Sequence, residues 1–60
     1  MNDLEYFIEL LDKQNNWLLR PIQGSNVRIE IYKDGDMNNH SPDNEIRIYF
    51  CHGKMNQQYK

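Results

Sequence analysis

The residues from 34 to 45 have the spacing of a calcium-binding loop. Counted from Asp34, oxygen-bearing side chains stand at the first, third, fifth and twelfth places: Asp34, Asp36, Asn38 and Glu45. Carboxylate and amide oxygens at these places can surround a hard cation. However, Asn39 stands where the motif has glycine, and the flanking segments have the character of strands rather than helices. We therefore predict a polar hairpin loop without a metal, and a calcium-binding module is the alternative.

Acidic residues gather in two parts of the chain, although the formal net charge is only -2. Residues 1–12 and residues 34–45 each carry -4, and the rest of the chain carries +6. Such acidic surfaces attract basic partners, and aromatic rings anchor many protein interfaces. The alternative is that the acidic residues only compensate the helix dipole and solvate the loop. The residues that we expect to contact a protein partner are Glu5, Glu9, Trp17, Tyr32, Asp34, Asp36 and Asp43.

A second candidate surface combines basic and aromatic residues of two alternating segments. Its members would share the outer face of a sheet: Arg28, Tyr32, Arg47 and Tyr49. RNA-binding sheets stack bases on aromatic rings within a basic field. Here no RNP-like segment is present, and the negative net charge argues against nucleic acid as the main partner. We interpret these residues as cross-strand pairs, and a nucleic-acid-binding regulator is the alternative function.

The sequence contains no recognisable catalytic set. His40 and His52 lack a partnered nucleophile, and Cys51 stands on a predicted strand. The spacing of these three residues does not resemble a zinc signature. We therefore predict a protein that is not an enzyme and that uses no cofactor.

Residues 2–14 are predicted to form an amphipathic helix. Its apolar residues recur at intervals of three and four and so share one face: Leu4, Phe7, Ile8 and Leu11. Asn2 and Glu5 have the spacing of a capping box, and Asn15–Asn16 can end the helix. The same period could continue through residues 17–20, but we prefer the shorter helix.

Two later segments, 27–32 and 45–51, alternate between apolar and polar residues, which is typical of half-buried strands. Their apolar residues would face the helix: Val27, Ile29, Ile31, Ile46, Ile48 and Phe50. Residues 17–22 are a third predicted strand, which Pro21 restricts to the edge of a sheet. Residues 52–60 are expected to be a polar tail. We therefore predict an α+β fold in which one N-terminal helix packs on a three-stranded antiparallel meander.

The length of 60 residues allows one small domain, 1–60, with a thin stability margin. No apolar run approaches the roughly 20 residues that span a bilayer, and the acidic N-terminus is unlike a secretion signal. A single cysteine fits a reducing compartment. These features predict a cytoplasmic protein with no membrane contact. Because the sheet would keep open edges and an uncovered face, we also expect a homodimer.

The composition adds one indication of origin. Eight of the 60 residues are Asn and none is Ala, which suggests AT-rich codons of the kind found in many phages. We therefore expect a small non-enzymatic protein that binds and modulates another macromolecule. The specific hypothesis is a phage or mobile-element inhibitor of a host defence or nucleic-acid-processing complex.

Overall fold

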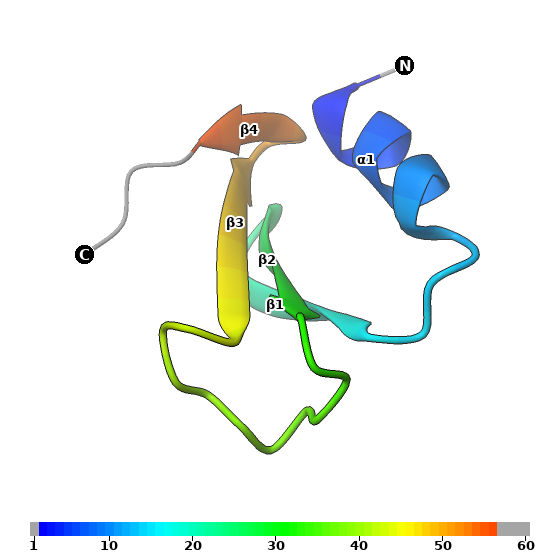
Figure 1. The fold of residues 1–60 in the computed structure, drawn as a ribbon. Coiled ribbons are helices and arrows are strands. Elements are labelled where there is room, and N and C mark those ends of the chain that lie inside the picture. The colour runs from blue at the N-terminus through cyan, green and yellow to red at the C-terminus, as the bar shows by residue number, and fades with distance from the viewer. Residues whose placement is uncertain (1, 57–60) are drawn as a thin grey trace.

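The chain forms one helix and a four-stranded antiparallel sheet in a computed structural model, which describes residues 2–56. The elements are helix α1 (Asp3–Leu11) and strands β1 (Trp17–Gln23), β2 (Asn26–Tyr32), β3 (Glu45–Cys51) and β4 (Lys54–Asn56). The strands lie in chain order, β1-β2-β3-β4, as a meander (Figure 1). The predicted α+β fold, with one N-terminal helix packed on an antiparallel meander, is confirmed, but the sheet has four strands instead of three.

The predicted capping box starts α1. The side chain of Asn2 accepts a hydrogen bond from the Glu5 N–H at 2.8 Å, and the Glu5 carboxylate accepts one from the Asn2 N–H at 3.3 Å. The helix ends at Leu11 rather than at residue 14. The N–H groups of Asp12 and Gln14 bond to carbonyls three residues back instead of four, and such tightened turns are common at helix ends. The shorter helix is therefore the correct alternative, and Trp17 begins a strand.

Strand β4 contradicts the prediction of a polar tail from residue 52. The chain reverses at His52 and Gly53, whose φ angles are 52° and 82°. A hairpin turn with two positive φ angles matches the twist of the strands, and Asn-Gly is its usual sequence signal. His-Gly gives a weaker signal, and the three residues of β4 are all exposed, so no apolar alternation indicates the strand. The remaining tail residues, 57–60, lie outside the described residues.

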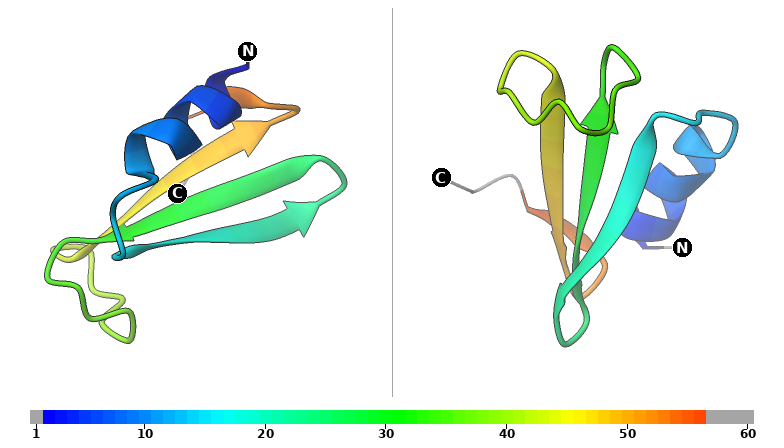
Figure 2. Two further views of the ribbon diagram at one scale, coloured as in Figure 1. Left: turned by 90° about the vertical axis from the view of Figure 1, so that its right-hand side faces the viewer. Right: turned by 90° about the horizontal axis from the view of Figure 1, so that it is seen from below.

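Helix α1 lies across one face of the sheet, with its N-terminus beside the turn between β3 and β4 (Figure 2). The Leu4 N–H donates a hydrogen bond to the Gly53 carbonyl at 3.0 Å. The rings of Phe7 and Phe50 pack with their centroids 5.7 Å apart. A Cβ at Gly53 would lie 2.6 Å from the side-chain nitrogen of Asn2. Glycine at this turn therefore permits both the backbone conformation and the close approach of α1.

The strand register divides the side chains between an apolar and a polar face. Direct cross-strand partners share a face, so the apolar face contains the rows Leu19–Ile29–Ile48 and Val27–Phe50. Ile29 and Phe50 are 0% and 1% exposed and form the core with the helix. Leu19 and Ile46 on the same face remain 38% and 39% exposed. Helix α1 therefore covers only part of the apolar face.

The polar face is more buried than the sequence predicts. Its members, by register, are Leu18, Arg20, Arg28, Glu30, Tyr32, Glu45, Arg47 and Tyr49. The loop of residues 33–44 bends away from α1 toward this face (Figure 2), and its His40 ring packs edge-on against Tyr32 at 5.7 Å. Tyr32 is 0% exposed, so the expectation of an exposed anchor at this residue is wrong. Alternation shows which residues share a face, but not whether a loop covers that face.

Candidate functional site

Glu30 is the centre of an ionic cluster on the polar face, where it is 1% exposed. Its Oε1 accepts hydrogen bonds from Arg20 Nε at 2.8 Å and from the Tyr32 hydroxyl at 2.5 Å. Its Oε2 lies 2.6 Å from Arg28 Nη2. Arg20 and Arg28 are direct cross-strand partners, and like charges in this relation repel. Glu30 therefore allows the two arginines to stand side by side.

A second carboxylate, Glu45, extends the cluster toward the loop. It accepts hydrogen bonds from Arg47 Nε at 3.0 Å and from Arg47 Nη2 at 3.3 Å. His40 Nδ1 lies 3.2 Å from the same carboxylate. The Tyr32 oxygen is 3.4 Å from Glu45 and 2.5 Å from Glu30, and its single hydrogen serves the shorter contact. Tyr32 thus joins the two carboxylate centres in the buried part of the face.

These contacts determine the charges of the cluster. Burial by itself raises the pKa of Glu30, but hydrogen bonds from Tyr32 and Arg20 and the charge of Arg28 lower that pKa to about 2. Burial and the hydrogen bond to Glu30 raise the pKa of Tyr32 to about 12. Burial also opposes ionisation of Glu45, but Arg47 and His40 lower its pKa. At neutral pH both carboxylates are therefore charged and the tyrosine is neutral.

The loop of residues 33–44 is organised by its own polar side chains. Asp34 Oδ1 accepts the Asp36 N–H at 2.8 Å, and Asp36 Oδ1 accepts the Asn38 N–H at 3.0 Å. Asn44, which is 5% exposed, accepts the Asp34 N–H at 2.7 Å and donates to the Asn39 carbonyl at 2.9 Å. The hydrogen bond from the Asp36 backbone lowers the pKa of Asp34. These carboxylates and amides build turns of the kind that such residues favour.

The structure separates the residues of the calcium-loop pattern. Asp34 and Asp36 accept backbone N–H groups within the loop, whereas Glu45 is turned onto the sheet and paired with Arg47. A calcium site needs these oxygens to converge on one point. Between residues 2 and 56, no group of three or more His, Cys, Asp or Glu side chains could hold a metal ion. The spacing of this loop therefore serves turn formation in the structure.

The outward side of α1 forms a second candidate surface, which we name the α1 patch: Glu5, Tyr6, Glu9 and Leu10. Tyr6 and Leu10 are each 58% exposed and lie one turn apart, and both glutamates are exposed. The acidic loop lies at the other end of the sheet and is displaced toward the opposite face (Figure 2). The two acidic groups, whose relation the sequence leaves open, therefore form separate surfaces.

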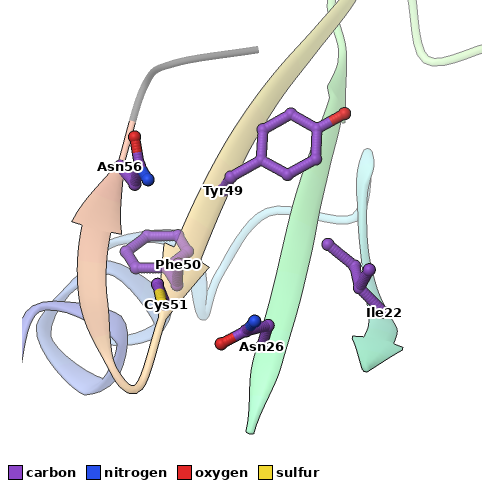
Figure 3. Close-up of a pocket in the computed structure, with 6 residues that line it drawn as sticks. All are labelled: Ile22, Asn26, Tyr49, Phe50, Cys51 and Asn56. Carbon is purple, nitrogen blue, oxygen red and sulfur yellow. The ribbon is translucent and has the colours of Figure 1, made fainter. Parts of the chain in front are cut away.

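A pocket opens on the polar face near the turn between β1 and β2. Its volume is about 260 Å³, and its lining residues are Ile22, Asn26, Tyr49, Phe50, Cys51 and Asn56 (Figure 3). Arg28 lies beside it, with its guanidinium carbon 5.9 Å from the centroid of the Tyr49 ring. The Arg28 Nε atom is buried and makes no hydrogen bond within the described part of the chain. An apolar hollow thus adjoins a row of arginines.

The residues predicted to contact a partner differ in their exposure. Glu5, Glu9 and Asp43 are exposed, as a contact surface requires, and Trp17 is half-buried on the apolar face opposite Ile31. Sequence reasoning missed Leu10, which is outside the half-buried apolar stripe of α1. It also missed Arg20, because the register set by the two-residue turn Gly24–Ser25 would place this residue opposite Ile29. A one-residue register shift between Pro21 and Gln23 places it opposite Arg28 instead.

Comparison with known proteins identifies no relative, because no protein-family model, curated protein or solved structure matches the chain. The helix within residues 2–56 is too short to cross a membrane. Functional conclusions therefore depend on the surfaces of this structure alone.

Proposed function

We propose that the protein is a small, non-enzymatic binding protein that uses the α1 patch to dock on a basic surface of a protein partner. The exposure of Tyr6 and Leu10 carries this proposal. Both side chains point away from the sheet, because Leu4, Phe7, Ile8 and Leu11 occupy the opposite stripe of the helix. Aromatic and aliphatic side chains that are free on a helix are suited to fill a groove in a partner.

Charge determines the kind of partner. Glu5 and Glu9 stand one turn apart next to the apolar pair, and both are exposed. They form an acidic border that would lie opposite lysine or arginine in an interface and would accelerate encounter. The partner of this proposal is therefore a protein with an apolar groove bordered by basic residues. In line with the asparagine-rich composition, we propose that this partner belongs to a host macromolecular complex. The protein itself would be a phage or mobile-element product that modulates this complex in the cytoplasm.

The test compares capture by two matched pairs of variants. Tyr6→Ala combined with Leu10→Ala should abolish capture of the partner from a lysate of the host, whereas Leu19→Ala on the apolar sheet face should not. Glu9→Lys should weaken capture at least about tenfold, because it places a like charge against the basic border. Asp43→Lys in the loop is its control.

Capture should survive nuclease treatment of the lysate. Retention of the partner by the Tyr6 and Leu10 variant, with its helix content unchanged by circular dichroism, would refute the assignment of this surface.

A further inference from the structure

We propose that the polar face binds single-stranded nucleic acid, with a base in the pocket beside Tyr49 and its phosphates on the neighbouring basic row. This site is distinct from the α1 patch, which lies on the other side of the molecule (Figure 2). The register places Arg20, Arg28 and Tyr49 in one row across β1, β2 and β3. The pocket follows in the next row toward the turn.

The arginines of this site are held in place by contacts within the protein, before a ligand binds. Glu30 holds Arg20 through Nε and Arg28 through Nη2, which orients both guanidinium groups and leaves other N–H donors of each without a contact to this carboxylate. Arginine presents five donors in a rigid fork that suits phosphate oxygens. The side chains of Arg20 and Arg28 are 47% and 25% exposed. A phosphate can therefore approach them from solvent while Glu30 remains beneath.

The charge of this face differs in sign from that of the whole protein. Its basic residues by register are Arg20, Arg28, Arg47 and Lys54, and its acidic residues are Glu30 and Glu45. The face therefore carries a formal charge of +2, whereas the chain carries -2. The acidic loop lies at the end of the face away from the pocket. An anionic ligand is thus directed toward the pocket end, where Lys54 stands opposite Cys51.

The pocket explains why the ligand should carry a base. A volume of about 260 Å³ has room for one planar ring system, and the Tyr49 ring forms part of the wall (Figure 3). Base stacking on aromatic rings is the common basis of single-strand binding. Asn26 accepts the His52 N–H through its oxygen, and its NH₂ group can donate to the edge of a base. An acidic peptide would satisfy the arginines but would leave the pocket without a planar group.

The experiment measures binding of a labelled 12-nucleotide single strand and of the same sequence as a duplex by fluorescence anisotropy. We expect the single strand to bind at least about tenfold more tightly, because a duplex keeps its bases stacked. With two to three phosphate contacts, the logarithm of affinity should fall with the logarithm of salt with a slope of about -1.4 to -2. Lys54→Gln should reduce both affinity and slope, and Lys13→Gln, in the turn that follows α1, should change neither.

Two readouts separate base recognition from charge attraction. Tyr49→Leu should weaken single-strand binding at least about fivefold, because stacking on its ring is lost. The only cysteine, Cys51, is exposed and lines the pocket, so bound single strand should slow its reaction with a thiol reagent. These measurements require that each variant keep the circular dichroism spectrum of the parent. Should Tyr49→Leu fail to fold, the protection of Cys51 in the unmodified protein still decides the question.

Three results would overturn the proposal. The first is no binding at 50 mM salt and 100 μM protein, and the second is equal binding of single strand and duplex without protection of Cys51. The third is full competition by oligoglutamate at equal charge, which would assign the face to an acidic protein segment.

Discussion

Replacing Glu30 by Gln tests whether the ionic cluster stabilises the fold as its geometry indicates. The change keeps the shape of the side chain and removes the negative charge that compensates the repulsion between Arg20 and Arg28. The pKa of Glu30 lies at about 2 in the folded protein, against an ordinary value of 4.5. Since one pKa unit corresponds to 1.36 kcal/mol, the folded environment favours the carboxylate over the neutral acid by about 3 kcal/mol.

Both arginines can partly regain water, because Arg20 is 47% and Arg28 25% exposed in their side chains. We therefore expect Glu30→Gln to lower the free energy of unfolding by about 2–4 kcal/mol, near the low end of the range for breaking a buried ion pair. A 60-residue domain has a total stability of about 3–9 kcal/mol. The loss should lower Tm by at least about 10 °C. If the stability of the parent is at the low end of this range, part of the variant population will be unfolded at 25 °C.

The assay is urea unfolding followed by circular dichroism at several pH values, with Glu9→Gln on the exposed side of α1 as the control. The folded pKa of Glu30 is below the unfolded value, so its contribution is complete above about pH 4.5 and is lost as the pH falls toward 2. The difference between the parent and Glu30→Gln should shrink over this interval. A loss below about 0.5 kcal/mol at pH 7, equal to that of the control, would refute the reasoning.

Three further predictions concern the turn, the loop and the assembly. Gly53→Ala should cost about 2–3 kcal/mol, because it adds a contact with Asn2 to the strain of a positive φ; Gly35→Ala, at a similar φ in open space, should cost only about 1–2 kcal/mol in the same unfolding assay. Millimolar calcium should leave Tm within about 2 °C of the value in magnesium, because the loop oxygens already accept backbone hydrogen bonds; a calcium-specific rise of several degrees would restore the calcium-binding hypothesis. Sedimentation equilibrium at micromolar concentration should give twice the mass of 7.3 kDa, through the part of the apolar face that α1 leaves exposed, and a mass of 7.3 kDa alone would contradict a homodimer.

The sequence was sufficient for the parts of the fold that depend on local periodicity. The intervals of three and four placed Leu4 and Phe7 toward the sheet, and strict alternation located β2 and β3 to within one residue. The capping box of Asn2 marked the first turn of α1. Each of these signals is carried by neighbouring residues in the chain, so no knowledge of distant contacts is required.

The parts that could not be predicted depend on contacts between distant segments. Tyr32 has the position of an exposed residue in the alternation, but His40 of the following loop packs against it. The exposed strand β4 depends on the positive φ of His52. A positive φ is expected from sequence mainly at glycine, asparagine and aspartate, so a histidine does not indicate this turn. The opposite placement of the α1 patch and the acidic loop is set by the whole topology. These same contacts determine which candidate site residues are accessible.

The polar cluster and the apolar core together specify one pairing of the strands. A slip of one residue between β1 and β2 would turn every side chain of one strand to the other face. If β1 is the strand that turns, Arg20 would leave Glu30 and enter the apolar face, and Leu19 would be placed among the charges. Separation of this ion pair and burial of the Arg20 charge among apolar side chains cost several kcal/mol, which is comparable to the whole stability of a domain of this size. An apolar residue in place of Glu30 could match its stability but would remove this penalty, so the buried ion pairs contribute specificity of register that hydrophobic packing alone would not supply.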